Sequence, residues 1–404
     1  MAASHLVSPQ KELVEQHWIL TDTSQNISTP DFMVEKETDS GEFPDWKIVK
    51  KTLQGGVSEG VEVIEINNGK LFISLLPTRG MGISHAELNG IRLGWGSRSQ
   101  RPVHPRHVSF NKHHGKGWLD GFSELMCRCG LESNGAPVFD GHTLIYPLHG
   151  KIANMPASFL DLTVDNSSRK ISVRGVVEET SSNSQKLRLI SSFTTDFNSH
   201  TFQWSDRVEN LSDSPATMQM IYHINIGSPI LEEGAKLIAP VKTVSPYDDT
   251  AASAGVLHWR SYDGPNSHST QHSFLVDLLA DSADLSHVLL KNRAGDLGVS
   301  IRFNKSHLPY FTLWRSTTPE TNCYVTALEP GTNFPNPRPF EEKHERVVRL
   351  KPRGSWTTTV GMDLHISKEQ VEGAQAAINL IQGSILPILN DQPLPDWSTA
   401  SVSI

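Results

Sequence analysis

The fold of this chain is decided by a stretch at residues 61–77 that reads VEVIEINNGKLFISLLP. Apolar residues alternate with polar ones on both sides of Asn68-Gly69, and an Asn-Gly pair favours the tight turn between two antiparallel strands. A second stretch of the same kind follows at residues 82–95, GISHAELNGIRLGW, with Asn89-Gly90 at its centre. Together they predict a run of antiparallel strands that begins near residue 61.

The same pattern of short alternating runs continues toward the C-terminus. Examples are RKISVRGVVEET, TFQWSDRVENL, ATMQMIYHINI and CYVTALEP. Turn-forming residues separate these runs, and the chain contains 29 Gly and 24 Pro. Strands do not alternate with helices, which disfavours a doubly wound sheet or a TIM barrel. We therefore expect an all-β fold, a large antiparallel β-sandwich, as a single domain over residues 51–404.

The two ends of the chain differ from this pattern. Residues 1–50 are mostly polar and irregular, and we expect them to form an N-terminal arm. Within it, SPQKELVEQHWIL suggests one short helix, with Ser8 as its N-cap and Pro9 at the first helical position. The tail, SKEQVEGAQAAINLIQGSILPIL, has helical spacing and predicts a C-terminal helix at about residues 367–390.

Composition excludes several classes of protein. The 404-residue chain has no run of about 18 apolar residues, so no membrane span is expected. Its net charge of −8 disfavours a nucleic-acid partner. Three cysteines cannot form a disulfide framework, and Cys127 and Cys129, which would lie on one face of a strand, could not easily bridge to each other. The first residues lack the apolar core of a secretion signal, so we expect a cytoplasmic protein. Nothing in the sequence indicates the oligomeric state.

One loop is rich in cations and histidines. Residues 100–118, QRPVHPRHVSFNKHHGKGW, carry Arg101, His104, Arg106, His107, Lys112, His113, His114 and Lys116. The loop can be interpreted as a basic cover over a pocket for a sugar or an anionic substituent, or as an ordinary solvated loop. The 18 histidines of the chain invite a metal hypothesis, but the spacings here match no closed zinc pattern. We therefore expect no metal and no other cofactor.

Three titratable residues stand beside Gly or Pro, or near the end of an apolar run. They are His149 in PLHG, His223 in IYHIN and Glu329 in ALEPG. Two histidines and one carboxylate are the groups that acid–base chemistry near neutral pH requires. Glu329 lies inside the apolar run YVTALEP, where a buried carboxylate needs a partner or a function. Spacing alone does not bring the three together, and on the residues alone a histidine in such a position is more often a hydrogen-bonded structural residue.

The order of these residues resembles a known family. A His-Gly pair, then a histidine on a strand, then a glutamate near the C-terminus is the order found in the aldose 1-epimerases, or galactose mutarotase-like proteins. The chain is most similar to their DUF4432-type relatives. The resemblance covers about residues 60–365, through LLPTRGMGISHAELNGIRLGW, WLDGFSELMCRCGLESNG, YPLHGKIANMPA, DRVENLSDSPATMQMIYHINIGSPIL and ALEPGTNFPNPRPFEE. It implies a large sandwich with an open cleft that holds a free sugar.

The resemblance also implies roles for the three residues. Glu329 would be the base at the anomeric hydroxyl, and His223 would be the acid at the ring oxygen. His149 would donate a hydrogen bond to the ring oxygen or to a neighbouring hydroxyl. The partner is then a small-molecule carbohydrate, and no metal or nucleotide is required.

Substrate-binding residues are less clear, because His223 is followed by Ile-Asn-Ile-Gly where classical mutarotases have Pro-Tyr-Phe-Asn. Asp248 and Asp249 are the candidates for the substrate-binding aspartate of the family. Other pocket residues are expected at Arg79, in PTRGMG, and from Glu124 to Arg128, in FSELMCR. Arg79 could instead form a salt bridge that ties its turn.

Two tryptophans, Trp95 and Trp118, are candidates for stacking on a sugar face, and core packing is an equally good interpretation of each.

Three functions remain open on the sequence alone. The first is an aldose 1-epimerase-like enzyme that interconverts sugar anomers. The second is a carbon-centre epimerase or isomerase of ketoses, and the third is a non-catalytic sugar-binding sandwich. A glycosidase would need two suitably spaced carboxylates, and Glu124 is the only partner for Glu329 that we would consider.

Overall fold

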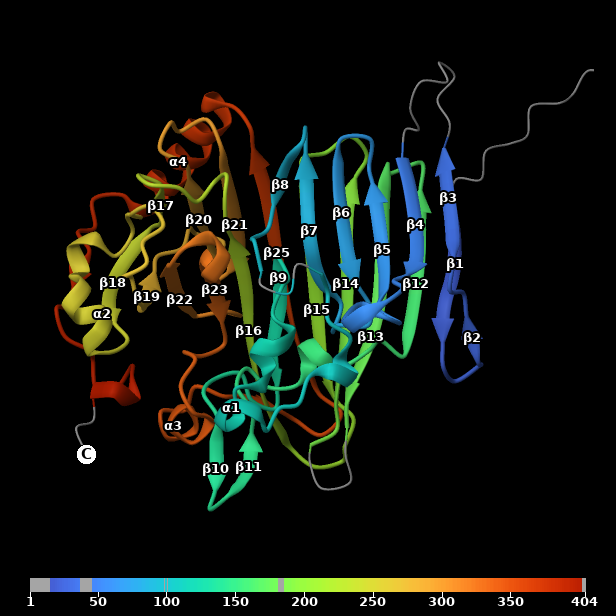
Figure 1. Ribbon diagram of the computed structural model, residues 1–404, viewed down its shortest axis with the longest axis horizontal. Coiled ribbons are helices and arrows are strands. Elements are labelled where there is room, and N and C mark those ends of the chain that lie inside the picture. Colours follow the sequence, from blue (N-terminus) through green and yellow to red (C-terminus); the bar gives the residue numbers. More distant parts are fainter. Residues whose placement is uncertain (1–14, 37–45, 98, 100, 181–184, 402–404) are drawn as a thin grey trace, which may run out of the picture.

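Two large sheets pack face to face in the computed structural model, which describes residues 15–36, 46–97, 99, 101–180 and 185–401 (Figure 1). One sheet has ten strands and the other has fourteen, and neighbouring strands are antiparallel except at one edge. The predicted all-β sandwich is therefore confirmed.

The ten-stranded sheet runs, in spatial order, through β17 (Lys236–Ile238), β20 (Leu285–Lys291), β21 (Gly298–Asn304), β25 (Ser355–His365), β15 (Thr201–Asn210), β14 (Leu187–Asp196), β13 (Lys170–Glu179), β12 (Phe159–Asp165), β1 (Glu15–Asp22) and β2 (Ile27–Ser28).

The fourteen-stranded sheet runs through β26 (Ile388–Leu389), β18 (Val241–Pro246), β19 (Gln271–Leu278), β22 (Tyr310–Thr317), β23 (Tyr324–Gly331), β16 (Ala216–Ile226), β9 (Met126–Leu131), β7 (Gly82–Leu88), β6 (Leu71–Leu76), β5 (Glu62–Asn67), β4 (Trp46–Thr52) and β3 (Phe32–Lys36), with β8 (Ile91–Leu93) on β7 and β24 (Val348–Leu350) on β16. A separate hairpin joins β10 (Val138–Asp140) and β11 (Thr143–Tyr146). The helices are α1 (Lys112–Gly115), α2 (Asp249–Ala254), α3 (Arg338–Lys343) and α4 (Lys368–Gln382).

Both predicted hairpins are present. The turn at Asn68 joins β5 to β6, and the Asn68 side-chain oxygen accepts hydrogen bonds from the next two non-glycine backbone N–H groups. The turn between β7 and β8 places Asn89 at φ 53° and Gly90 at φ 76°. Two successive positive φ angles define the turn that matches the twist of antiparallel strands, which explains why Asn-Gly occupies it.

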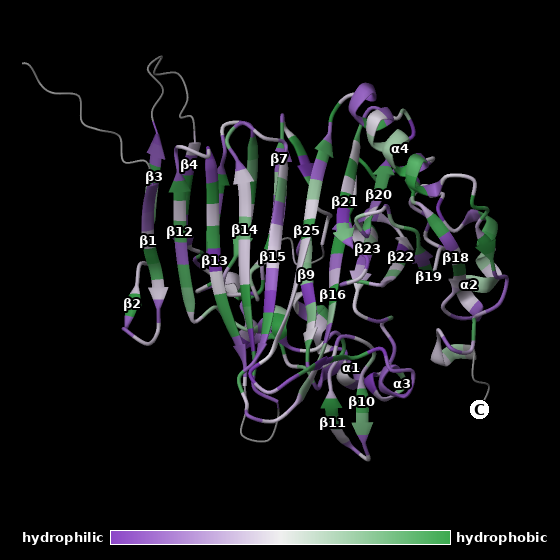
Figure 2. Cartoon of the chain, turned by 180° about the vertical axis from the view of Figure 1, so that it is seen from behind, coloured by the Kyte–Doolittle hydropathy of each residue, from purple (hydrophilic) through white to green (hydrophobic). Residues whose placement is uncertain are grey.

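The core lies between the two sheets, because alternate residues of each strand point inward. Along β13 and β14 the buried and more exposed positions alternate over the whole strand. Figure 2 shows that hydrophobic and hydrophilic residues both occur along the strands of this sheet. Residues such as Val173, Trp204 and Tyr222 fill this core. The core covers only one face of the fourteen-stranded sheet, so side chains on its opposite face do not pack in this core.

In residues 15–36 and 46–50 the structure shows strands where an N-terminal arm was predicted. β1 pairs with β12 in one sheet, whereas β3 and β4 extend the other sheet beyond β5. The physical reason is that Leu20, Trp46 and Ile48 are buried in the core, so these short segments contribute strands and not a loose arm. The predicted N-terminal helix begins outside the described residues, and its second half, from Glu15, is strand.

The C-terminal helix is confirmed as α4 and ends earlier than predicted. Ser367 caps its N-terminus, and Val371, Ala374 and Ile378 pack on the sandwich. The helix ends at Gly383, with φ 55°, and residues 388–389 form β26 alongside β18. Within the described part of the chain, no helix has the length and apolar character needed to cross a membrane.

Candidate active site

Strand register places two of the predicted residues side by side. The register that pairs Ile221 with Gly331 and Asn225 with Ala327 sets His223 of β16 opposite Glu329 of β23. Their side chains lie on the face of the sheet away from the core. The Nε2 atom of His223 is 3.4 Å from Oε1 of Glu329, and both side chains are buried. The two residues are therefore a pair of adjacent acid–base groups.

His149 reaches the same place from a loop. Its backbone N–H donates to Gly135 O, and its backbone carbonyl accepts from Gly130 N–H. These contacts hold it at φ 58°, an unusual conformation for a residue with a side chain. The imidazole of His149 lies 5.4 Å, centre to centre, from that of His223. All three predicted residues thus line one cleft of about 500 Å³.

Asn225 fixes the tautomer of His223. The Asn225 amide nitrogen donates to the backbone carbonyls of Glu124 and His223, at 2.9 and 3.2 Å. Because carbonyls only accept, the Asn225 oxygen must be the atom that faces His223 Nδ1, at 2.6 Å. His223 Nδ1 therefore carries a hydrogen, and its Nε2 is directed at Glu329.

Burial and charge separate the pKa values of this pair. Burial lowers the pKa of His223, as does the charge of His149, and together they bring it to about 3 despite the opposing hydrogen bond to Asn225. Burial raises the pKa of Glu329 well above its usual value, and the charge of His149 partly offsets this rise. A proton shared by the pair therefore favours Glu329 over His223.

His149 behaves in the opposite way to His223. Burial on its own would lower the pKa of His149, but the charge of Cys129 and a hydrogen bond to its thiol raise the pKa to about 9. Glu329 raises it further, as does the backbone carbonyl of Asn134, which accepts from His149 Nδ1 at 3.0 Å. The cleft thus contains one cationic and one neutral histidine at pH 7.

Aromatic side chains form the walls around His223. The rings of Phe122, Trp314 and Trp118 lie 5.1, 5.7 and 6.1 Å from the His223 ring. Trp118 is buried, and its edge also contacts His149, so it packs the wall. Trp314 is partly exposed and lines the cleft, which makes it available to a sugar face.

Asp248 and Trp95 have different positions. Asp248 lines the cleft with the three acid–base residues, and one of its oxygens caps α2 by accepting from Ala251 N–H at 2.8 Å. Trp95 lies outside the lining of this cleft and lines a neighbouring depression. Its indole N–H donates to Glu124 O, and its ring packs on Phe122. Trp95 therefore supports the wall of the cleft from behind.

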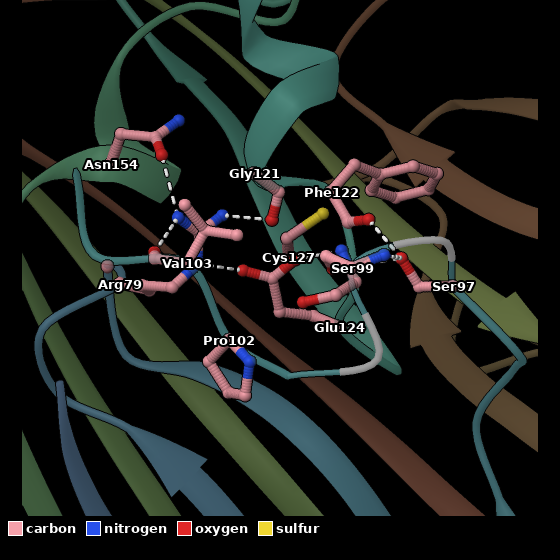
Figure 3. A network of polar contacts seen from close by, with 12 residues as sticks. Arg79, Ser97, Ser99, Pro102, Val103, Gly121, Phe122, Glu124, Cys127 and Asn154 are labelled. Carbon is pink, nitrogen blue, oxygen red and sulfur yellow. Dashed lines mark hydrogen bonds and ion pairs between the residues drawn. The ribbon is translucent and has the colours of Figure 1, made fainter. Parts of the chain in front are cut away.

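The prediction that Arg79 and Glu124 bind substrate is corrected by the structure. Both side chains are buried and form an ion pair, as Figure 3 shows. The remaining Arg79 nitrogens donate to Val103 O, Gly121 O and Asn154 Oδ1 at 2.8–2.9 Å. Each nitrogen of the guanidinium thus has a protein partner, and the network ties the loops together behind the cleft.

Arg128 is likewise removed from the substrate-binding set. It lies between Cys127 and Cys129 on β9, so its side chain points into the core while theirs point toward the cleft face. Its guanidinium makes a two-pronged ion pair with Asp206 of β15, at 2.5 and 3.0 Å. The pair joins the two sheets and does not reach the cleft.

Of its basic residues, the loop at 100–118 contributes only Lys116 to the lining of the cleft, within the described part of the chain. Arg106 donates to the backbone of Glu59, and Lys112 and His113 pair with the carboxylate of Asp120. Most of the loop is therefore a surface loop held by local contacts. Within the described ranges, no group of three or more His, Cys, Asp and Glu side chains is placed to hold a metal ion.

Three supporting residues were missed in the sequence. Asn225 lies two residues after His223, which is the spacing that puts two side chains on one face of a strand. Trp314, within YFTLWRS, lies on β22, which pairs with β23, the strand that carries Glu329. Asn134 acts through its backbone carbonyl, and no side-chain signal could have shown this.

The chain is similar to several known proteins. The model of a family described as a domain of unknown function, DUF4432, matches residues 58–364. The crystal structure of a candidate aldose 1-epimerase from Klebsiella pneumoniae is similar, with 35% identity and a TM-score of 0.90, over 94% of this chain and 99% of that one.

More distant structures share the fold. A galactose mutarotase-like protein from Clostridium acetobutylicum has 14% identity and a TM-score of 0.53, over 79% of this chain and 98% of its own. Galactose 1-epimerase from Lactobacillus acidophilus has 13% identity and a TM-score of 0.51, over 80% and 99%. No curated protein matches the chain. The resemblance predicted from the sequence is thus confirmed.

Proposed function

The chain belongs to the DUF4432 family, and we propose that it is an aldose 1-epimerase-like isomerase that interconverts the anomers of a free sugar by general acid–base catalysis. The observation that carries the proposal is the convergence of Glu329, His223 and His149 in one cleft, with the side chains of the first two 3.4 Å apart. Further support comes from the similar structure from Klebsiella pneumoniae, a candidate aldose 1-epimerase.

In the proposed reaction the ring of the sugar opens and closes again. The carboxylate of Glu329 accepts the proton of the anomeric hydroxyl, and the O–H electron pair becomes the second bond of the carbonyl. The bond from the anomeric carbon to the ring oxygen breaks, and the ring oxygen takes a proton from Nε2 of His223. After rotation about the next carbon–carbon bond, the reverse transfers close the ring as the other anomer.

The proton balance of this cycle matches the pair in the cleft. Ring opening leaves the proton on Glu329 and His223 neutral, which is the state favoured by their pKa values. A cyclic sugar requires the proton to shift to His223 across the 3.4 Å gap. The positive charge of His149 assists this shift, because it favours the carboxylate form of Glu329. Groups of this kind contribute on the order of 10²–10⁴-fold to a rate.

The experiment that tests the proposal follows freshly dissolved single anomers of hexoses, pentoses and uronic acids by polarimetry. We expect the protein to accelerate equilibration of at least one sugar, and Glu329→Gln to remove that acceleration. Glu320→Gln is the matched control, because Glu320 is an exposed glutamate just before β23. Acceleration that survives in Glu329→Gln would show that the role of Glu329 is wrong.

Two further measurements separate this function from the alternatives. In heavy water, anomer exchange leaves carbon-bound hydrogens in place, whereas a carbon-centre epimerase incorporates deuterium at carbon. Calorimetry that shows tight sugar binding without any anomer exchange would instead identify a sugar-binding protein. Either result would overturn the proposal.

A further inference from the structure

A row of three side chains crosses the floor of the cleft, and the reaction proposed above uses two of them. His223 of β16 lies opposite Glu329 of β23, and Glu329 in turn pairs with Thr312 of β22. All three residues line the cleft, and their exposed fractions are similar, at 5%, 3% and 2%. Thr312 is therefore the next residue of the cleft floor after the acid–base pair.

The hydroxyl of Thr312 differs from those of two other buried threonines nearby. Thr326 of β23 donates to Trp314 O at 2.8 Å, and Thr332, just after β23, donates to Asn333 Oδ1 at 2.9 Å. The Thr312 hydroxyl has no hydrogen-bond partner within the part of the chain that the structure describes. Because buried polar groups are nearly always hydrogen-bonded, a cleft-lining hydroxyl without a partner points to a ligand.

The order of the row matches the order of atoms in a sugar ring. In the proposed reaction, His223 acts at the ring oxygen and Glu329 acts at the anomeric hydroxyl. The anomeric carbon has two neighbours in the ring, which are the ring oxygen and carbon 2. Adjacent strands lie about 4.8 Å apart, so the residue on the other side of Glu329 from His223 faces carbon 2. That residue is Thr312.

We propose that Thr312 is a substrate-binding residue whose hydroxyl forms a hydrogen bond with the 2-hydroxyl of the sugar, and that the substrate is an aldose that carries this hydroxyl. This contact rests on the proposed function, because the roles of His223 and Glu329 set the pose of the sugar. A 2-deoxy sugar leaves the Thr312 hydroxyl buried without a partner, and it therefore binds more weakly.

A second hydroxyl of the cleft provides a matched control. Ser273 of β19 pairs with Trp314, whereas Thr312 pairs with Glu329. Ser273 also lines the cleft, but it lies one strand further from the acid–base pair. Its loss removes a hydroxyl from the same cleft without touching the position that faces carbon 2.

The test compares D-glucose, D-galactose and D-ribose with their 2-deoxy counterparts on the wild type, Thr312→Val, Thr312→Ser and Ser273→Ala. Dissociation constants come from NMR titration of the full chain, and kcat/KM comes from anomer exchange. Valine keeps the β-branched shape that suits a strand, and its introduction leaves no protein group without a partner. Because each pair of sugars is compared on every variant, the intrinsic reactivities of the sugars cancel.

We expect Thr312→Val to weaken binding of the complete sugar roughly 2–12-fold, the range of one neutral hydrogen bond, and to leave binding of the 2-deoxy sugar nearly unchanged. Thr312→Ser keeps the hydroxyl and should keep the preference for the complete sugar. Ser273→Ala should leave the ratio within each pair as it is in the wild type.

Equal binding of both members of each pair by the wild type would overturn the inference, as would equal losses for both in Thr312→Val or the same change of ratio in Ser273→Ala. Absence of binding to all of these sugars would overturn it as well. If the sugars bind with the expected preference but neither the wild type nor any variant accelerates anomer exchange, the proposed function fails and the contact of Thr312 stands.

Discussion

Replacement of Asn225 tests the link between the tautomer of His223 and its chemistry. In Asn225→Ala the His223 Nδ1–H loses a 2.6 Å partner and remains buried. The Glu124 carbonyl keeps one donor, the indole of Trp95 at 3.1 Å. The main cost is therefore one unsatisfied buried donor, about 1–3 kcal/mol.

That cost grows when His223 is protonated, because the Asn225 oxygen stabilises the imidazolium and raises the pKa of His223. If 1–3 kcal/mol is lost in the transition state, the rate falls roughly 5–150-fold. Asn225→Asp is the informative partner variant. It keeps the acceptor and adds a negative charge, so the pKa of His223 should rise from about 3 toward neutrality.

The assay is the pH dependence of the mutarotation rate, measured by polarimetry for wild type and both variants. The wild type loses activity on the acid side only when His223 and Glu329 both carry protons, near the pKa of His223. The acid limb should therefore move to higher pH in Asn225→Asp, while Asn225→Ala lowers the rate without that movement. Equal rates in wild type and Asn225→Ala, or an acid limb that moves the same way in both variants, would refute the reasoning.

Three further predictions concern stability. Arg128→Met leaves Asp206 buried without its ion pair and should lower the free energy of unfolding by about 3–5 kcal/mol in urea titrations; a loss below 1 kcal/mol would contradict the inter-sheet role. Gly150→Ala should lower the melting temperature far more than Gly141→Ala. Both glycines have a positive φ, but only at Gly150 would a Cβ meet backbone oxygens, at 2.0 and 2.3 Å. Comparable melting temperatures of the two variants would argue against this close approach. Burial lowers the pKa of His287 to about 4, so the free energy of unfolding should fall as the pH drops from 6.5 to 4. His287→Asn should make this dependence on pH less steep. An unchanged dependence would exclude this histidine as a cause.

Much of the fold was readable from local chemistry. Asn89-Gly90 marked a turn because two positive φ angles are required there, and alternation predicted the strands that follow. The first strands escaped prediction, because β1 and β4 are short and lie among polar segments. Their burial depends on β12 and β5, which no local pattern near residues 15–50 reveals.

The site was predictable where order along the chain carried the information. His149, His223 and Glu329 follow one another as in the family that the sequence resembles, and the structure brings them together. The prediction that Arg79 and Arg128 bind substrate was wrong because the sequence does not distinguish a basic side chain that faces a cleft from one that faces a buried carboxylate. Only strand alternation and the partners in the core decide between these two positions.

The most direct test of the central claim is exchange NMR of a sugar already at anomeric equilibrium. Magnetisation transfer between the α and β anomeric hydrogens reports ring opening and closing alone. With wild-type protein we predict transfer that rises in proportion to protein concentration for at least one aldose, and its loss in Glu329→Gln. Transfer that remains at the rate of the protein-free sugar across neutral and acidic aldoses would contradict the account.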